Sequence, residues 1–281
     1  MMYLRLDRML ADVCDDETIE HECFTFNGGE RHIKIKPKGD CFNPRTVTIE
    51  TSGYGNVMDV LLAADALRRL GVDRINLLLP YVPYARQDRV MVRGEPLSAK
   101  VFAELINSQC FEKVYTLDNH SPVITALLND VVEIDQYRIW DEVIENAFAP
   151  ILICPDAGAM KKTYAIAAHY GGKSVECSKE RCVATGEIIS TRVNAVNFNK
   201  QTCIIIDDIC DGGRTFTEIA TVLKKKNAGK IILYVTHGIF SKGLEPFKGL
   251  IDKVYTTNLK PNAMELNVPF DIVPLLKGDL R

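Results

Sequence analysis

Short runs of aliphatic residues alternate with helical patterns along the chain, and this alternation constrains the fold more than any other feature of the sequence. The runs are nearly continuous in Val, Ile and Leu, which is typical of strands buried on both faces of a parallel sheet. We expect such strands at 46–50, 75–80, 114–118 and 131–135 in the first half, and at 151–154, 202–207, 231–235 and 253–257 in the second.

Helical patterns fill the intervals between these strands. Apolar residues recur at helical spacing over 57–67, and Gly71 stands where a glycine commonly ends a helix. Ser98 is expected to cap a second helix. Further helices are predicted near 160–170 and 214–227.

The length of the chain favours two domains. Its 281 residues correspond to about two domains of typical size. Strands that alternate with helices predict right-handed crossovers, and therefore an α/β fold with a mostly parallel sheet flanked by helices in each domain. We place the domains at 1–148 and 149–281, although no flexible linker marks the boundary near Ala149 and Pro150.

Composition and charge exclude several classes of protein. The 34 Lys and Arg residues and 37 Asp and Glu residues give a net charge of −3, so the chain has no strong field for nucleic acid or a membrane surface. No apolar run approaches the roughly 18 residues that span a bilayer. The nine cysteines are odd in number and never form Cys-x-x-Cys, so we expect reduced thiols. The first ten residues contain no secretory apolar segment, and we expect a cytoplasmic protein.

Polar loops follow several of the predicted strands. In open parallel sheets, ligands bind at the carboxyl ends of the strands, so these loops are where chemistry is expected. The loops are YVPYARQDR (81–89), DNHSP (118–122), PDAGAMKK (155–162) and DDICDGGRT (207–215).

The loop at 207–215 has the features of a phosphate-binding cradle. Glycines allow backbone N–H groups to converge, and the helix that follows adds its dipole. The two adjacent acids before the glycines suit sugar hydroxyls or a divalent cation. An exposed turn with a helix cap is the alternative, but the coincidence of acids, glycines and strand favours a site. The residues of this predicted cradle are Asp207, Asp208, Asp211, Gly212, Gly213, Arg214 and Thr215.

This segment resembles the phosphoribosyl pyrophosphate signature of type I phosphoribosyltransferases and of ribose-phosphate pyrophosphokinases. Other segments distinguish the two, because they resemble the pyrophosphokinase family alone and extend over almost the whole chain. They match its nucleotide loop, its Asp-x-His, its pyrophosphate loop and its Lys-x-Arg segment. The matching residues are 81–89, Asp118-Asn119-His120, 155–162 and Lys179-Glu180-Arg181, with FNGGE at 26–30 and THGIF at 236–240.

The resemblance implies a two-domain fold like that of type I phosphoribosyltransferases, and transfer of a pyrophosphoryl group from ATP to the anomeric hydroxyl of ribose 5-phosphate. The products would be phosphoribosyl pyrophosphate and AMP, with magnesium (Mg²⁺) as cofactor. It implies that Lys179 and Arg181 are catalytic and that the cradle binds ribose 5-phosphate. The other implied residues are Phe26, Glu30, Arg86, Gln87, Asp88 and His120 for ATP, Asp156, Ala157 and Gly158 for pyrophosphate, and His120 and Asp156 for magnesium.

Phe26 and Glu30 fall where the family binds adenine across a subunit boundary, which implies a homo-oligomer based on a dimer, with a hexamer as the larger alternative. Two other functions stay open at this point. One is a non-catalytic family member that regulates active subunits, and the other is a type I phosphoribosyltransferase.

Several positions depart from the family pattern. Val90 and Gly94 stand where basic residues are common, in the region that the family associates with an activating phosphate. Ala159 replaces a glycine of the pyrophosphate loop, and Gly212-Gly213-Arg214 replaces Thr-(Ala/Cys)-Gly in the cradle. The short carboxyl-terminal segment DIVPLLKGDLR is a further departure. We therefore expect weak regulation by phosphate and ADP.

Overall fold

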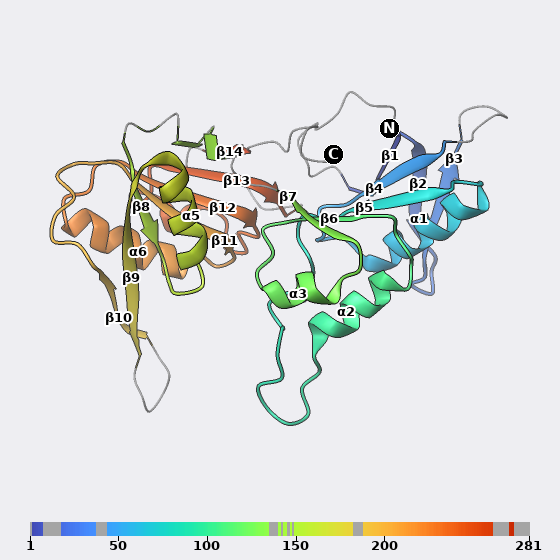
Figure 1. Cartoon of the computed structure of the whole chain (residues 1–281), viewed down its shortest axis with the longest axis horizontal. Coiled ribbons are helices and arrows are strands. Elements are labelled where there is room, and N and C mark those ends of the chain that lie inside the picture. Colours follow the sequence, from blue (N-terminus) through green and yellow to red (C-terminus); the bar gives the residue numbers. More distant parts are fainter. Residues whose placement is uncertain are drawn as a thin grey trace. The chain divides into compact units, whose positions relative to one another are not determined.

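The computed structural model describes residues 2–7, 18–37, 44–134, 140–141, 143–144, 147, 149–181, 188–260 and 270–272. The chain divides into two compact units, of which the first contains Met1–Asp135 and the second Gln136–Pro274 (Figure 1). The DIVPLLKGDLR segment lies almost entirely outside the described residues.

The first unit contains a five-stranded sheet whose strands are all parallel. Three of these strands are buried over almost their whole length, as continuous apolar runs predict. Across the sheet the order is β1 (Met2–Arg5), β4 (Thr46–Glu50), β5 (Arg74–Leu78), β6 (Val114–Leu117) and β7 (Val131–Ile134).

The helices α1 (Val57–Arg69), α2 (Ser98–Asn107) and α3 (Pro122–Leu127) connect these strands and lie on one side of the sheet in Figure 1. The Asn56 side chain begins α1 by accepting a hydrogen bond from the Met58 N–H at 3.0 Å. Gly71 follows the end of α1 with a φ of 83°, which confirms its predicted place.

The predicted cap of α2 is wrong. Leu97 occupies the cap position, no side chain caps this helix, and Ser98 is already its first helical residue. Inside the first turn, the Ser98 hydroxyl is no longer at the position from which a cap reaches the following N–H groups. Of the apolar residues in this helix, Phe102 and Ile106 are buried, whereas Val101 is 62% exposed.

An antiparallel hairpin of β2 (Glu20–Thr25) and β3 (Arg31–Lys36) was not among the predicted strands. Ile33 and Ile35 join the core of the first unit. The Arg31 guanidinium also donates to the Asp59 carboxylate, with 2.8 Å between Nε and Oδ1. The hairpin is therefore held to α1 by apolar packing and by an ion pair.

The second unit contains a seven-stranded sheet, parallel except at one edge, where β10 pairs antiparallel with β9. The order is β10 (Ile188–Val193), β9 (Lys173–Arg181), β8 (Ile151–Cys154), β11 (Cys203–Cys210), β12 (Ile231–Gly238), β13 (Lys253–Leu259) and β14 (Phe270–Ile272), with helices α5 (Met160–Tyr170) and α6 (Arg214–Lys225) and the 3₁₀ turn η1 (Glu245–Phe247). The predicted class, a mostly parallel sheet flanked by helices in each unit, is confirmed.

The division between the units lies at 135/136, whereas we predicted 148/149. Trp140 is fully buried, and its ring centroid lies 4.1 Å from that of Tyr234 in β12. This aromatic contact places the segment around Trp140 with the second unit. No helix in the described ranges is long and apolar enough to cross a membrane.

Candidate functional site

The loop between β5 and α2 presents its predicted nucleotide-binding residues to solvent. Arg86 and Gln87 are exposed. The backbone of Gln87 is nevertheless fixed, because its N–H donates to Tyr84 at 2.9 Å and its carbonyl accepts from Ala99 at 3.2 Å. Tyr84 adopts a left-handed φ of 64° to make this turn. The loop thus combines a defined backbone with accessible side chains.

Asp88 links this loop to the segment after β6. Its carboxylate accepts hydrogen bonds from Arg89 Nε at 2.8 Å and from Ser121 Oγ at 2.7 Å. The hydrogen bonds from Arg89 and then Ser121 lower the pKa of Asp88 to about 2. Ser121 also begins α3, because its Oγ accepts from the Val123 N–H. Asp88 therefore links the loop between β5 and α2 to the segment after β6. Its position in the sequence did not reveal this structural role.

The segment after β6 presents His120 on the surface. Asp118 is buried and has a φ of 47°, a left-handed conformation that is costly for a residue other than glycine. Asn119 anchors the turn, since its Nδ2 donates to Thr116 Oγ1 at 2.8 Å and its N–H donates to Glu133 Oε1 at 3.1 Å. These contacts set the position of the exposed His120.

Phe26 and Glu30 close the turn between β2 and β3, with the Phe26 N–H donating to the Glu30 carbonyl at 2.9 Å. Phe26 is 53% exposed. Its ring centroid lies 5.0 Å from that of Phe24 and 5.7 Å from that of His32, so the three rings form a surface cluster. An aromatic side chain this exposed is available to a ligand or a second molecule.

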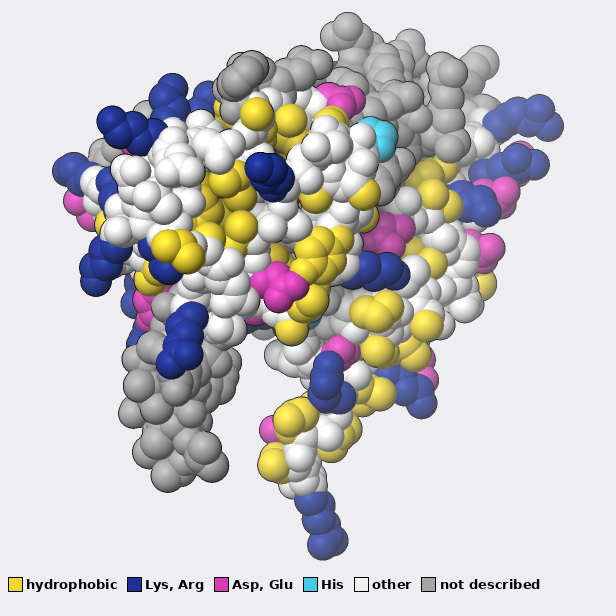
Figure 2. Space-filling view, turned by 60° about the vertical axis from the view of Figure 1, so that its left-hand side comes forward, with side chains coloured by type: hydrophobic (Ala, Val, Ile, Leu, Met, Phe, Trp, Pro, Cys, Tyr) yellow, Lys and Arg dark blue, Asp and Glu magenta, His cyan; other side chains and the backbone are white. Residues whose placement is uncertain are grey.

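Apolar side chains also cover the segment that follows the nucleotide-binding residues. Val90, Met91 and Val92 are 51%, 73% and 61% exposed. Figure 2 shows hydrophobic side chains along this projecting part of the first unit. The turn is held by the Glu95 carboxylate, which accepts from the N–H groups of Met91 and Val92.

The acidic pair of the second unit lies in a strand. We expected the strand to end at residue 207, but β11 continues through Cys210, and Asp207 pairs with Val235 of β12. Burial, followed by repulsion from Asp208 and a smaller contribution from Asp156, raises the pKa of Asp207 well above its usual range. The carboxyl groups of Asp156, Asp207 and Asp208 therefore lie close enough to repel one another, the first just after β8 and the other two in the second half of β11.

Asp156 organises the loop after β8, which we predicted to bind pyrophosphate. Its Oδ1 accepts from the N–H groups of Gly158 at 3.0 Å and Ala159 at 3.4 Å. Ala157 and Gly158 are exposed, whereas Ala159 is buried with a φ of −81°. That φ suits any residue, so the replacement of the family glycine by alanine at 159 is harmless to the backbone.

The predicted phosphate cradle is a three-residue loop, Asp211–Gly213, between β11 and α6. Gly213 has a φ of 75°, and a Cβ there would lie 2.6 Å from Phe247 Cζ, so both conformation and space require glycine. The first N–H groups of α6, from Arg214 and Thr215, have no acceptor within the helix. The N-cap residue is Gly213, which has no side chain to cap the helix. The geometry suits an anion.

Lys179 and Arg181 lie in β9. They occur near the end of the strand, opposite Thr191 and Ile188 of β10. The contacts of their side chains lie outside what the structure describes.

The structure brings together Asp156, Asp207 and Asp208 in the second unit, and Asp88 with the segment carrying His120 in the first. Sequence reasoning missed Ser121 and Asn119. Ser121 followed by Pro122 is a common start of a helix, and this signal could have identified it.

Among the described residues, no three His, Cys, Asp or Glu side chains are arranged so that they could hold a metal ion. The oxygen donors at Asp156, Asp207 and Asp208 still suit Mg²⁺, because this ion usually takes one or two carboxylates together with waters and phosphate oxygens. Their mutual repulsion is also what a cation would relieve.

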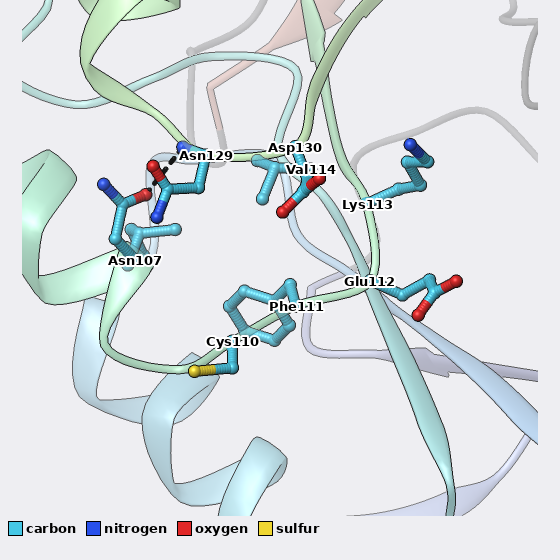
Figure 3. A pocket seen from close by; sticks show the side chains of 9 residues that line it. Asn107, Cys110, Phe111, Glu112, Lys113, Val114, Asn129 and Asp130 are labelled. Carbon is cyan, nitrogen blue, oxygen red and sulfur yellow. Dashed lines mark hydrogen bonds between the residues drawn. The ribbon is translucent and has the colours of Figure 1, made fainter.

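A cavity of about 390 Å³ lies beside the starts of β6 and β7 in the first unit (Figure 3). It is lined by residues of the α2–β6 and α3–β7 connections, among them Cys110, Lys113 and Asp130. Asn107 Oδ1 accepts from the Asn129 N–H beside it at 2.9 Å. The cavity contains none of the predicted site residues.

Each unit of the chain matches a known protein family model. Residues 4–109 match the model of the N-terminal domain of ribose phosphate pyrophosphokinase, and residues 193–269 match the phosphoribosyl synthetase-associated domain. A ribose-phosphate pyrophosphokinase of Cereibacter sphaeroides is 34% identical, over 78% of this chain and 68% of the relative. One of Shewanella oneidensis is 30% identical, over 86% and 78%. One of Pyrococcus furiosus is 28% identical, over 89% and 90%.

The fold is similar to a solved structure, the phosphoribosylpyrophosphate synthetase of Mycobacterium smegmatis. The TM-score is 0.79 at 22% identity, and the match covers 97% of this chain and 94% of the other. This likeness confirms the predicted fold over the length of the chain.

Proposed function

The chain belongs to the ribose-phosphate pyrophosphokinase family, and from this membership we infer that it is a ribose-phosphate diphosphokinase. The enzyme transfers the pyrophosphoryl group of ATP to the anomeric hydroxyl of ribose 5-phosphate. The products are phosphoribosyl pyrophosphate and AMP.

The observation that supports this conclusion most is that one chain contains both the loop at 81–89, proposed to bind ATP, and the cradle at 207–215, proposed to bind the sugar phosphate. A type I phosphoribosyltransferase would have no use for the loop at 81–89, whose Gln87 is held out to solvent by backbone hydrogen bonds. A non-catalytic family member is expected to have interrupted catalytic loops, whereas His120, Asp156, Lys179 and Arg181 are all present. Neither alternative is favoured.

For ATP, we propose binding by Arg86, Gln87 and His120 of the first unit, with Asp88 supporting the loop that carries the first two. The exposed guanidinium of Arg86 suits phosphate, and the Gln87 amide can both donate to and accept from an adenine edge. Asp88 is already bonded to Arg89 and Ser121, so we assign it the task of holding the loop in shape.

For ribose 5-phosphate, the proposed site is the acidic pair and the loop that follows it. The carboxylates of Asp207 and Asp208 would accept hydrogen bonds from sugar hydroxyls, and the loop Asp211–Gly213 with Arg214 and Thr215 would bind the phosphate. Asp156, Ala157 and Gly158 are assigned to the pyrophosphate. Lys179 and Arg181 are assigned to the charge that develops during transfer.

Magnesium is the cofactor that we propose, with His120 and Asp156 as its ligands or close neighbours. When bound, it neutralises phosphate charge during pyrophosphoryl transfer. The carboxylate donors of the second unit fit an ion that takes most of its other ligands from ATP and water.

A homo-oligomer based on a dimer, with a hexamer as the larger alternative, is our further proposal. The exposed Phe26 and the nearby Glu30 support it, because an aromatic ring on the surface can pack on adenine bound by a second subunit. Light scattering after gel filtration measures the assembly. Phe26→Ala should weaken ATP binding without changing the affinity for ribose 5-phosphate.

The test of the function is direct. The purified protein is incubated with ATP, Mg²⁺ and ribose 5-phosphate, and AMP is measured. AMP that requires ribose 5-phosphate is the expected result. A protein that releases no AMP but assembles with an active family member would be the regulatory alternative, and one that consumes phosphoribosyl pyrophosphate with a nucleobase would be a phosphoribosyltransferase.

A further inference from the structure

Two cationic side chains stand beside the cradle loop Asp211–Gly213. Arg214 begins α6, and its Nε donates to Glu218 Oε1 at 2.8 Å, one helical turn further along. This ion pair keeps the Arg214 charge on the helix surface, where its side chain is 77% exposed. The Arg214 guanidinium is therefore already paired with Glu218. Of the two cations it is the weaker candidate for contact with a bound phosphate.

Lys242 is the second cation, and it belongs to a segment that follows β12. Its side-chain stem lies over Gly212, with Cε 3.8 Å and Cδ 3.9 Å from the position that a Cβ at residue 212 would occupy. Because Gly212 has no side chain, the aliphatic part of Lys242 can lie directly over the backbone of the loop. Among the described residues, the Lys242 ammonium forms no ion pair or hydrogen bond.

The backbone around Lys242 is fixed to the cradle. The Ser241 N–H donates to the Asp211 carbonyl at 3.2 Å, and the Phe240 N–H donates to the Cys210 carbonyl at 3.1 Å. Gly243 closes the turn with a φ of 63°, and its N–H donates to Phe240. Lys242 thus belongs to a turn that is hydrogen-bonded to the cradle loop, where the phosphate would bind.

We propose that Lys242 is a further substrate-binding residue, whose ammonium pairs with the 5-phosphate of ribose 5-phosphate on the loop Asp211–Gly213. The proposal rests on the proposed function, since it assigns a residue to the same sugar-phosphate site. The start of a helix supplies only partial positive charge to a dianion. A lysine supplies a full charge and three donors, and an unpaired ammonium beside an anion site gives charge-assisted hydrogen bonds when the anion binds.

The test compares Lys242→Met with Lys225→Met, which removes an exposed lysine at the far end of α6. Steady-state kinetics with Mg²⁺ gives KM for both substrates, and calorimetry measures ribose 5-phosphate binding without turnover. Lys242→Met should weaken ribose 5-phosphate roughly 10- to 100-fold, the effect of losing one charge-assisted hydrogen bond. KM for ATP should stay within about twofold, and Lys242→Arg should retain most of the affinity.

The outcomes separate this inference from the function itself. If the wild type releases AMP and Lys242→Met binds ribose 5-phosphate within twofold of it, the assignment of Lys242 is overturned and the function stands. If the wild type binds ribose 5-phosphate but forms no AMP, the function is overturned, and calorimetry still decides the role of Lys242. A wild type that does not bind ribose 5-phosphate overturns both. Equal losses in the Lys225 control would show a general charge effect and also overturn the assignment.

Discussion

The hydroxyl of Ser121 donates a hydrogen bond of 2.7 Å to the carboxylate of Asp88 and so joins the loops that follow the neighbouring strands β5 and β6. The same hydroxyl accepts from the Val123 N–H at the start of α3. One side chain therefore connects the loop between β5 and α2, the segment carrying His120 and the first turn of a helix.

Removing the Ser121 hydroxyl should weaken the binding of ATP. In Ser121→Ala, Asp88 loses one of its partners, and we expect KM for ATP to rise about 5- to 10-fold, equivalent to one hydrogen bond, while KM for ribose 5-phosphate stays unchanged. Ser121→Thr keeps the hydroxyl and should restore most of the affinity. Steady-state kinetics with each substrate varied measures both effects, and an equal rise in both KM values would contradict the assignment.

Asp207→Asn should stabilise the ligand-free protein at neutral and alkaline pH. A raised pKa in the folded state means that Asp207 stabilises the fold below its unfolded pKa near 4, and that this contribution is lost as pH rises through the folded pKa. Asparagine removes the repulsion and still accepts the Asp208 N–H. We expect Tm to rise by about 2–4 °C at pH 8, with little difference near pH 4.

Thermal unfolding without ligand and with a chelator measures this effect, and Asp211→Asn, an exposed acid in the same region, is the control. Asp207→Asn should also bind ribose 5-phosphate poorly. A variant less stable than the wild type at pH 8 would show that the ionised carboxylate stabilises the empty site.

Gly213→Ala should destabilise the second unit, whereas Gly212→Ala should not. Alanine at 213 combines a φ of 75° with a Cβ 2.6 Å from the ring of Phe247, whereas the closest atom to a Cβ at 212 is 3.8 Å away. Strain and overpacking together predict a loss of about 2–4 kcal/mol in the free energy of unfolding for Gly213→Ala. Urea unfolding of the two variants provides a matched comparison, and similar stabilities would refute the argument from Phe247.

Lys179→Ala should lower kcat by on the order of 10²-fold and leave both KM values within a few-fold, because its assigned interaction strengthens in the transition state. Lys173→Ala, which removes an exposed lysine at the other end of β9, is the control. Steady-state kinetics of the two variants tests the role. Normal turnover with weakened substrate binding would make Lys179 a binding residue only.

Activity should not require added inorganic phosphate. Val90, Val92 and Gly94 supply no charge in the region that the family associates with phosphate activation, and each missing charge-assisted contact removes roughly 1.5–3 kcal/mol. Initial velocity in phosphate-free buffer, followed by titration with phosphate, should change less than about twofold. Strong activation, or ADP inhibition that saturating ATP does not relieve, would point to cations elsewhere in the chain.

The sequence predicts those parts of the fold that are encoded locally. Buried parallel strands are continuous apolar runs, and α1 has its apolar periodicity and its closing glycine. The β2–β3 hairpin lacks such a signal, because most residues of β2 are exposed and polar and aromatic residues are mixed along it. β9 and β10 form an antiparallel ribbon at a sheet edge, where no apolar run is required.

In the candidate site, too, the sequence predicts the residues that lie together in one local motif and misses those that only the fold brings together. The acidic pair and the glycines form one contiguous motif, so the sequence alone indicated an anion site at Asp207–Thr215. Ser121 and Lys242 lie 33 and 30 residues from their partners Asp88 and Gly212. Only the folded chain brings them together, and no local pattern could have assigned them. The extension of β11 through the acids was missed because two adjacent aspartates are rare in strands.

This extension of β11 bears on how such a site can change over evolution. Asp207 and Asp208 are built into a hydrogen-bonded ladder with β12, whereas Asp211, Gly212 and Gly213 belong to a short connection that ends at a helix. Substitutions or insertions in the connection can alter which charged group is accepted there and leave the carboxylates in place. In the proposed assignment, recognition of the sugar ring and recognition of its phosphate can therefore diverge independently, because the first depends on residues of the sheet and the second on residues of the loop.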